Sequence, residues 1–214
     1  MQIIRKTLTI LILALTCSAV MDAATLTAQQ KKDVITKISA KTSSLKTMSC
    51  TFTQTKYLSM LSDKMVSQGK MDYKQPNKLR WEYTTPYKYT FILNGAKVYV
   101  AGSSRKDVID TNSNKIFKEI ARIMMNTVTG QALASPADFT TDVADGGTLW
   151  QVTLVPRKKD MKKMFARIVL SFDKKTLMVT EINIHENNRD RTDIKLKNVK
   201  TNTAINENLF AIPK

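Results

Sequence analysis

The chain has 214 residues, which is enough for one domain of ordinary size, and 43% of them are hydrophobic. Only 6 glycines and 5 prolines occur, so a collagen-like chain is excluded and a disordered one is disfavoured. With 34 lysines and arginines against 18 acidic residues, the formal net charge is +16, which favours an acidic partner.

The N-terminus is typical of a secretory signal peptide. Arg5 and Lys6 precede an apolar run over residues 8–15, and small residues such as Ala23 follow it. The run is too short to cross a bilayer as a helix, which takes about 20 residues. We therefore predict a signal peptide over residues 1–23 and a single exported domain over residues 24–214, to which most of the positive charge belongs.

The two cysteines leave one alternative open. Cys17 lies inside the predicted leader, so the mature domain keeps Cys50 alone and cannot form an intramolecular disulfide. A cysteine just after an apolar run could also be the lipid-modified first residue of a lipoprotein. Ala14 and Thr16, at the positions three and one before it, fit that signal poorly, and an ordinary leader cysteine is favoured.

Two stretches of the mature chain have helical spacing of apolar residues, over 26–45 and 114–128. Lysines fill the other face of the first, and Thr25 or Thr27 is the expected N-cap. A second short turn or helix is expected after Gly130. We predict two amphipathic helices and this short addition.

The rest of the chain alternates between apolar and polar residues, which predicts strands. Asn94 and Gly95 are a strong signal for a two-residue hairpin turn. About eleven short strands, in two runs separated by one helix, are too many in succession for alternating βαβ units and favour an antiparallel sheet that is strongly curved or nearly a barrel. The strands are expected over residues 48–55, 65–74, 78–84, 87–93, 97–101, 106–110, 139–143, 148–155, 164–172, 177–185 and 191–199.

The predicted strands carry one apolar face. Leu79, Trp81 and Tyr83 share a face of one strand, and Tyr89 and Phe91 share a face of the next. A barrel wider than about eight strands begins to leave an interior cavity. The two helices are the available covers, and any remaining gap is a candidate pocket for an apolar ligand. A tightly packed core without a cavity is the alternative.

The sequence contains no pattern that indicates catalysis. His185 beside Glu186 forms no recognisable triad, and no Gly-x-Ser-x-Gly elbow, phosphate loop or paired metal-ligand spacing occurs. We therefore expect neither an enzyme nor a metal or other cofactor. Nucleic acid is not expected as a partner, because the aromatic residues share faces with leucines instead of interleaving with cations.

A dense basic cluster is predicted to lie in a loop between two late strands. It could contact anionic headgroups or an acidic protein, or it could be a solvated loop. The cluster consists of Arg157, Lys158, Lys159, Lys162 and Lys163.

A central segment of the chain resembles the LolA family of periplasmic carriers that ferry lipoproteins to the outer membrane. Residues 74–83 read KQPNKLRWEY, Thr85 and Pro86 follow, and residues 94–100 read NGAKVYV. The order of the elements also agrees, and further matches are FTQ at residues 52–54 and the last strands from Phe172 and Asp173 to residues 198–200. The resemblance covers most of the mature chain.

The resemblance implies an α+β fold, mainly β: an unclosed antiparallel β-barrel with an α-helical lid over an apolar cavity. The cavity would hold the acyl chains of lipoproteins without catalysis. An inner-membrane ABC-type lipoprotein-releasing complex would load the carrier, and an outer-membrane acceptor would unload it. We expect a monomer in the periplasm.

Eight residues are candidates for the lipid-binding surface or its lid. Family members commonly have an arginine before the proline of the central segment, where it contacts the lid, and this chain has Gln75 there. The lipid-binding candidates are Leu79, Trp81, Tyr83, Tyr89, Phe91, Ile120, Met124 and Ile168.

Three other functions remain open at this point. The same fold could serve as an anchored LolB-like acceptor, which an acylated Cys17 would indicate, or it could carry another lipid. A chain with a filled core could instead bind acidic ligands on its basic surface.

Overall fold

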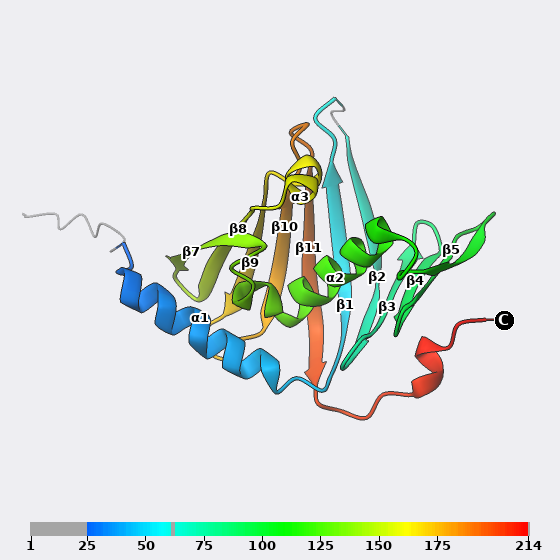
Figure 1. Cartoon of the computed structure of the whole chain (residues 1–214), viewed down its shortest axis with the longest axis horizontal. Coiled ribbons are helices and arrows are strands. Elements are labelled where there is room, and N and C mark those ends of the chain that lie inside the picture. The colour runs from blue at the N-terminus through cyan, green and yellow to red at the C-terminus, as the bar shows by residue number, and fades with distance from the viewer. Residues whose placement is uncertain (1–24, 61–62, 214) are drawn as a thin grey trace, which may run out of the picture.

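The computed structural model describes residues 25–60 and 63–213, and these form one strongly curved antiparallel sheet with helices along its concave side (Figure 1). The predicted signal peptide, with Cys17, lies outside the described residues. The strand order across the sheet is β6-β5-β4-β3-β2-β1-β11-β10-β9-β8-β7.

The sheet contains eleven strands in the described part of the chain, as predicted. Its first half consists of β1 (Thr47–Tyr57), β2 (Lys64–Lys74), β3 (Lys78–Thr85), β4 (Tyr89–Asn94), β5 (Lys97–Ala101) and β6 (Lys106–Asp110). Its second half consists of β7 (Phe139–Gly146), β8 (Leu149–Pro156), β9 (Arg167–Asp173), β10 (Val179–His185) and β11 (Arg191–Thr201).

The two halves join through β1 and β11, which pair in the middle of the sheet. The strands β6 and β7 lie at opposite edges and do not pair with each other. The predicted unclosed antiparallel barrel is therefore confirmed. The predicted turn between β4 and β5 is also present, with Gly95 at a φ of 63°, in the left-handed region that glycine adopts readily.

The two expected long helices are present, and the first begins after Thr27, one of its two expected N-caps. Helix α1 (Ala28–Ser43) starts at a capping box in which Thr27 and Gln30 exchange hydrogen bonds. Helix α2 (Lys115–Thr129) starts where the Asn114 side chain accepts a hydrogen bond from the Phe117 N–H, and it ends at Gly130 in the left-handed conformation. The short helix expected after Gly130 is the 3₁₀ turn η1 (Gln131–Ala134).

Helix α2 runs across the concave side of the sheet, where Figure 1 shows it in front of β1, β2 and β11. Ala121, Ile123, Met125 and Val128 of this helix are buried against the core. None of the described helices is long and apolar enough to cross a bilayer.

Two short elements were not predicted from the sequence. Helix α3 (Lys159–Met164) occupies the basic cluster that was expected to be a loop, and the strand expected to begin at Met164 begins at Arg167. The 3₁₀ turn η2 (Glu207–Phe210) buries Phe210. Both elements are too short for a visible period, and each depends on one buried side chain, Met161 in α3 and Phe210 in η2.

Candidate functional site: an apolar cavity under helix α2

A cavity of about 200 Å³ lies between α2 and the concave face of the sheet. Isoleucines from three neighbouring strands form one wall. Ile182 of β10 is paired with Ile194 of β11, and Ile184 of β10 is paired with Ile168 of β9. Because successive side chains of a strand point to opposite faces, this register brings the four side chains to one apolar surface.

Aromatic residues of β3 form the opposite wall. Trp81 and Tyr83 line the cavity, and the Phe52 ring behind them lies 4.4 Å from the Trp81 ring and 5.2 Å from the Tyr83 ring, centroid to centroid. The Trp81 indole N–H is buried within this wall.

Two polar groups at the cavity surface, from β1 and β3, bond to each other. The Tyr83 hydroxyl donates a hydrogen bond to Gln54 Oε1 at 2.9 Å. Burial raises the pKa of Tyr83, so the phenol stays neutral and keeps its proton for this bond. The cavity is thus apolar with a few fixed polar groups, the usual character of a site for an amphipathic ligand.

Helix α2 is the lid of this cavity. Ile123, Met124, Thr127 and Val128 form the cavity surface of the helix. Because the helix turns once in 3.6 residues, these positions lie on one stripe facing the sheet.

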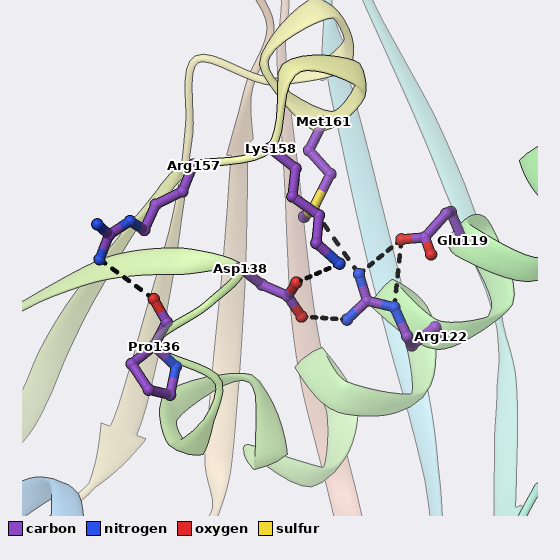
Figure 2. A network of polar contacts seen from close by, with 7 residues as sticks. All are labelled: Glu119, Arg122, Pro136, Asp138, Arg157, Lys158 and Met161. Atoms are coloured by element: carbon purple, nitrogen blue, oxygen red, sulfur yellow. Dashed lines mark hydrogen bonds and ion pairs between the residues drawn. The ribbon is translucent and has the colours of Figure 1, made fainter.

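A network of polar contacts fixes the lid in place (Figure 2). Arg122 of α2 binds Glu119 of the same helix and reaches Asp138, which lies just before β7. The same carboxylate accepts a hydrogen bond from Lys158 Nζ at 2.7 Å, and an Arg122 nitrogen lies 3.8 Å from Met161 Sδ of α3. Helix α2 is therefore tied to the segment before β7, through Asp138, and to the region of α3, through Met161.

The opposite charges of this network stabilise each other's ionised forms. Burial opposes ionisation of Asp138, but hydrogen bonds from Lys158 and Arg122 outweigh it and hold the pKa of this carboxyl below its ordinary value. Burial also opposes the charged form of Arg122, and the carboxylates of Glu119 and Asp138 overcome that effect and raise its pKa. The network is consequently ionised at neutral pH.

The structure brings four of the eight lipid-binding candidates together around the cavity: Trp81, Tyr83, Met124 and Ile168. The side chain of Ile120 lies outside the described part of the structure. The other three do not line this cavity, although two of them pair with cavity residues across β3 and β4.

Leu79 is fully buried and packs within the core instead of lining the cavity, and Phe91 is also a core residue. Tyr89 is 41% exposed near the end of the sheet that carries β5 and β6. Alternation predicts the face of a strand that a residue occupies, but not whether that part of the strand lies under α2.

Gln75 lies in the turn between β2 and β3 and is exposed. Its backbone N–H donates to the Lys46 carbonyl oxygen at 2.9 Å. The ion pairs that hold the lid are made instead by Arg122 of α2 itself, which was not among the sequence-predicted candidates.

Sequence reasoning also missed cavity residues. Gln54 and Thr192 are polar, so a search for apolar side chains passed over them, although alternation places both on the concave face. Phe165 follows α3, which was not predicted, and no periodic signal could have assigned it to the cavity.

The chain matches the model of one protein family over residues 43–213, and that family is described as "Outer membrane lipoprotein carrier protein LolA". The chain belongs to the LolA family. An outer-membrane lipoprotein carrier protein of Methylibium petroleiphilum is 26% identical to this LolA-family chain over 150 residues, 70% of this chain and 71% of the relative. Another, from Methylococcus capsulatus, is 24% identical over 170 residues, 78% and 77% of the two chains.

Solved structures share the fold of this LolA-family protein at low sequence identity. An uncharacterized conserved protein from Thermus thermophilus aligns with a TM-score of 0.52 at 10% identity, covering 86% of this chain and 94% of the other. The Pseudomonas aeruginosa MucA/MucB complex contains a chain that aligns with a TM-score of 0.52 at 9% identity, covering 85% of this chain and 60% of the other. At such identities these likenesses concern the fold alone.

Family membership identifies this protein as a LolA-family lipoprotein carrier or binder, a role that requires no catalysis. Among the residues that the structure describes, no cluster of three His, Cys, Asp or Glu side chains is placed to hold a metal ion.

Proposed function

We propose that this protein is a periplasmic carrier that binds the acyl chains of lipoproteins and ferries them from the inner to the outer membrane. The proposal includes removal of residues 1–23 as a signal peptide, loading by an inner-membrane ABC-type releasing complex and unloading to an outer-membrane acceptor. The observation that supports it best is the apolar cavity between α2 and the sheet.

The size of the cavity indicates how a cargo would be held. Its volume of about 200 Å³ is below the range of about 300–1,000 Å³ that is usual for ligand pockets. The cavity therefore accommodates part of an acyl chain in this state, and a whole chain requires α2 to move away from the sheet. Each buried CH₂ group contributes about 0.8 kcal/mol, so even partial burial gives useful affinity.

The transfer needs no chemical step. Burial of hydrocarbon is non-directional and depends on area, so the cargo moves to whichever partner offers more apolar contact. Closing α2 over the chain shields it from water, and opening α2 exposes it to an acceptor.

Binding of a fluorescent fatty-acid analogue to the purified mature protein tests the cavity. Met124→Glu places a charge on the half-buried lid residue that faces the cavity, and we expect affinity for the analogue to fall about tenfold or more, because the carboxylate must be desolvated beside hydrocarbon. Val108→Glu introduces the same charge at a 52% exposed site on β6 and should bind like the parent.

A second measurement concerns the cargo itself. Protein purified from the periplasm under mild conditions should carry acylated lipoprotein, detected by mass spectrometry of the copurified material. Recovery without any acylated protein, together with equal analogue binding by both variants, would contradict the proposal.

A further inference from the structure

The end of the sheet next to α3 has a surface that the cavity does not explain. Three segments meet there, and we call them the rim: the β1–β2 end with Tyr57, Met60, Met65 and Val66, the β10–β11 turn over residues 186–190, and α3. Figure 1 shows all three at the same end of the molecule.

Hydrogen bonds hold the three segments of the rim together. Ser59 donates from its backbone N–H to Asp190 Oδ1 and from its hydroxyl to the Asn188 carbonyl oxygen, each at 2.8 Å. The Asn187 side-chain amide donates to the Lys162 carbonyl oxygen of α3 at 2.6 Å. The rim is thus one structured surface and not three independent loops.

Apolar side chains of the rim are exposed to solvent. Met60 is 94% exposed, Met65 is 55% exposed and Val66 is 44% exposed. A scattered exposed apolar residue is ordinary, but here Met65 and Val66 project to opposite faces of the same hairpin end, so the whole tip is apolar rather than one of its faces. Methionine suits such a surface because its flexible thioether adapts to irregular partners.

The charges around these side chains are mainly positive. The acidic groups are largely occupied: Glu186 pairs with Lys56, Asp160 pairs with Lys163, and Asp190 accepts the bond from Ser59, which leaves Asp63. Several exposed cations have no ion-pair partner in the described part of the chain. They are Lys64, Lys159, Lys162 and Arg189.

The rim also adjoins the cavity. Phe165, the residue directly after α3, lines the cavity. The paired residues Ile184 and Thr192 line it too, one position from the last pair of the β10–β11 hairpin, His185 and Arg191. A surface held against the rim would therefore lie beside this end of the cavity.

We propose that the rim docks on a phospholipid bilayer that contains anionic headgroups. The four unpaired cations contact the headgroups, and Met60, Met65 and Val66 enter the boundary between headgroups and acyl chains. The combination of an apolar tip with surrounding cations fits a bilayer interface better than it fits an acidic protein, which would need only the charges. The inference rests on the proposed function in one respect. The docked orientation brings the cavity beside a membrane, and the carrier would take up or release acyl chains there.

The test is cosedimentation of the mature protein with vesicles. Vesicles of phosphatidylglycerol and phosphatidylcholine should bind the protein, vesicles of phosphatidylcholine alone should bind it weakly, and salt should weaken the binding. The double variant Lys159→Glu/Lys162→Glu should lower partitioning about tenfold or more. Met60→Ser should lower partitioning while leaving its salt dependence unchanged.

The matched control is Lys32→Glu/Lys37→Glu, which makes the same charge change on the exposed side of α1, far from the rim (Figure 1). It should bind vesicles nearly as well as the parent. Equal loss in both double variants would show that only net charge matters and would overturn the proposal, as would full binding by Met60→Ser.

Two further outcomes separate this inference from its alternatives. Binding to polyglutamate without binding to phosphatidylglycerol vesicles would overturn it in favour of an acidic protein partner. The fatty-acid analogue distinguishes it from the proposed function, because the rim variants should keep their cavity binding. A parent protein that binds vesicles but not the analogue would contradict the carrier function alone.

Discussion

Gly69 of β2 lies where the backbone of β3 and a core aromatic ring come closest. A Cβ atom built at this position would lie 2.0 Å from the Glu82 carbonyl oxygen and 2.5 Å from the Phe52 ring. Phe52 in turn packs on Trp81 and Tyr83 of the cavity wall. Because glycine has no side chain, the Phe52 ring can pack directly on the backbone of β2.

We predict that Gly69→Ala destabilises the protein by about 1–3 kcal/mol, because β2 and β3 must separate to admit the methyl group. Urea unfolding followed by tryptophan fluorescence measures the change in free energy. Gly102→Ala is the control, since its Cβ atom would meet Tyr89 at an ordinary 3.6 Å. Equal stability of the two variants would show that the strands adapt without cost.

At the scale of elements, α2 is held at both ends and in the middle. Its first turn is capped by Asn114, and its last residue is followed by Gly130 at a φ of 72°, where a Cβ atom would come within 3.0 Å of Thr42 in α1. Arg122 fixes the middle through Asp138. A lid that must move can release this central contact while its capped ends keep it helical.

We predict that Arg122→Ala loosens α2, at a cost of about 1–3 kcal/mol, because the nearly buried Asp138 carboxylate loses one of its two cations. Amide hydrogen exchange in α2 should accelerate, and the fatty-acid analogue should enter faster. Lys118→Ala on the same helix removes an exposed lysine that makes no ion pair in the described structure and is the control. Unchanged exchange in Arg122→Ala would contradict the role of the network.

Acidification should loosen α2, as Arg122→Ala does. The folded-state pKa of Asp138 lies below its ordinary value, so the network contributes stability above that ordinary value and loses it as the pH falls through the folded-state pKa. Arg122→Ala already opens this network at neutral pH. Acid should therefore accelerate amide hydrogen exchange in α2 less in the variant than in the parent.

At the scale of the whole molecule, the C-terminal segment closes over the convex face of the sheet. The Phe210 side chain is fully buried there, with Ile92 of β4 also buried, and the Arg80 guanidinium donates to the Leu209 carbonyl oxygen at 3.2 Å. The Glu207 carboxylate contacts Lys74 of β2 and Lys78 of β3. The chain end thus clamps β3, which carries the aromatic wall, together with its neighbours β2 and β4.

We predict that this clamp weakens in acid. Hydrogen bonds from Lys74 and Lys78 lower the pKa of Glu207 to about 2 from an ordinary 4.5. Its contribution is therefore complete above pH 4.5 and is lost as the pH falls towards 2. The difference in melting temperature between the parent and Glu207→Gln should be largest near neutral pH and should vanish near pH 2, because protonation of the parent then removes the same charge.

The control for this prediction is Asp160→Asn, which removes the charge of a side chain that is 92% exposed. Exposed ion pairs contribute little, so its melting temperature should follow the parent across the pH range. A Glu207→Gln difference that persists unchanged at pH 2 would contradict the assigned contacts.

Local patterns in the sequence determined much of the fold. The caps Thr27, Asn114 and Gly130 set the helix ends, because each satisfies backbone groups within a few residues of itself. The alternation of apolar residues determined the strands and the inward side of each, because side chains alternate across a strand whatever its neighbours are. The central segment around Trp81 also pointed to the correct family.

Only the tertiary structure decided which inward-facing residues meet at the cavity. Leu79 and Trp81 are equivalent by alternation, yet one packs in the core and the other lines the cavity, because the place where α2 crosses the sheet depends on long-range packing. Other contacts likewise join separate segments of the chain. Arg122 of α2 meets Asp138 and α3, and the rim brings three segments together. Such contacts depend on strand register and sheet curvature, which no local period encodes.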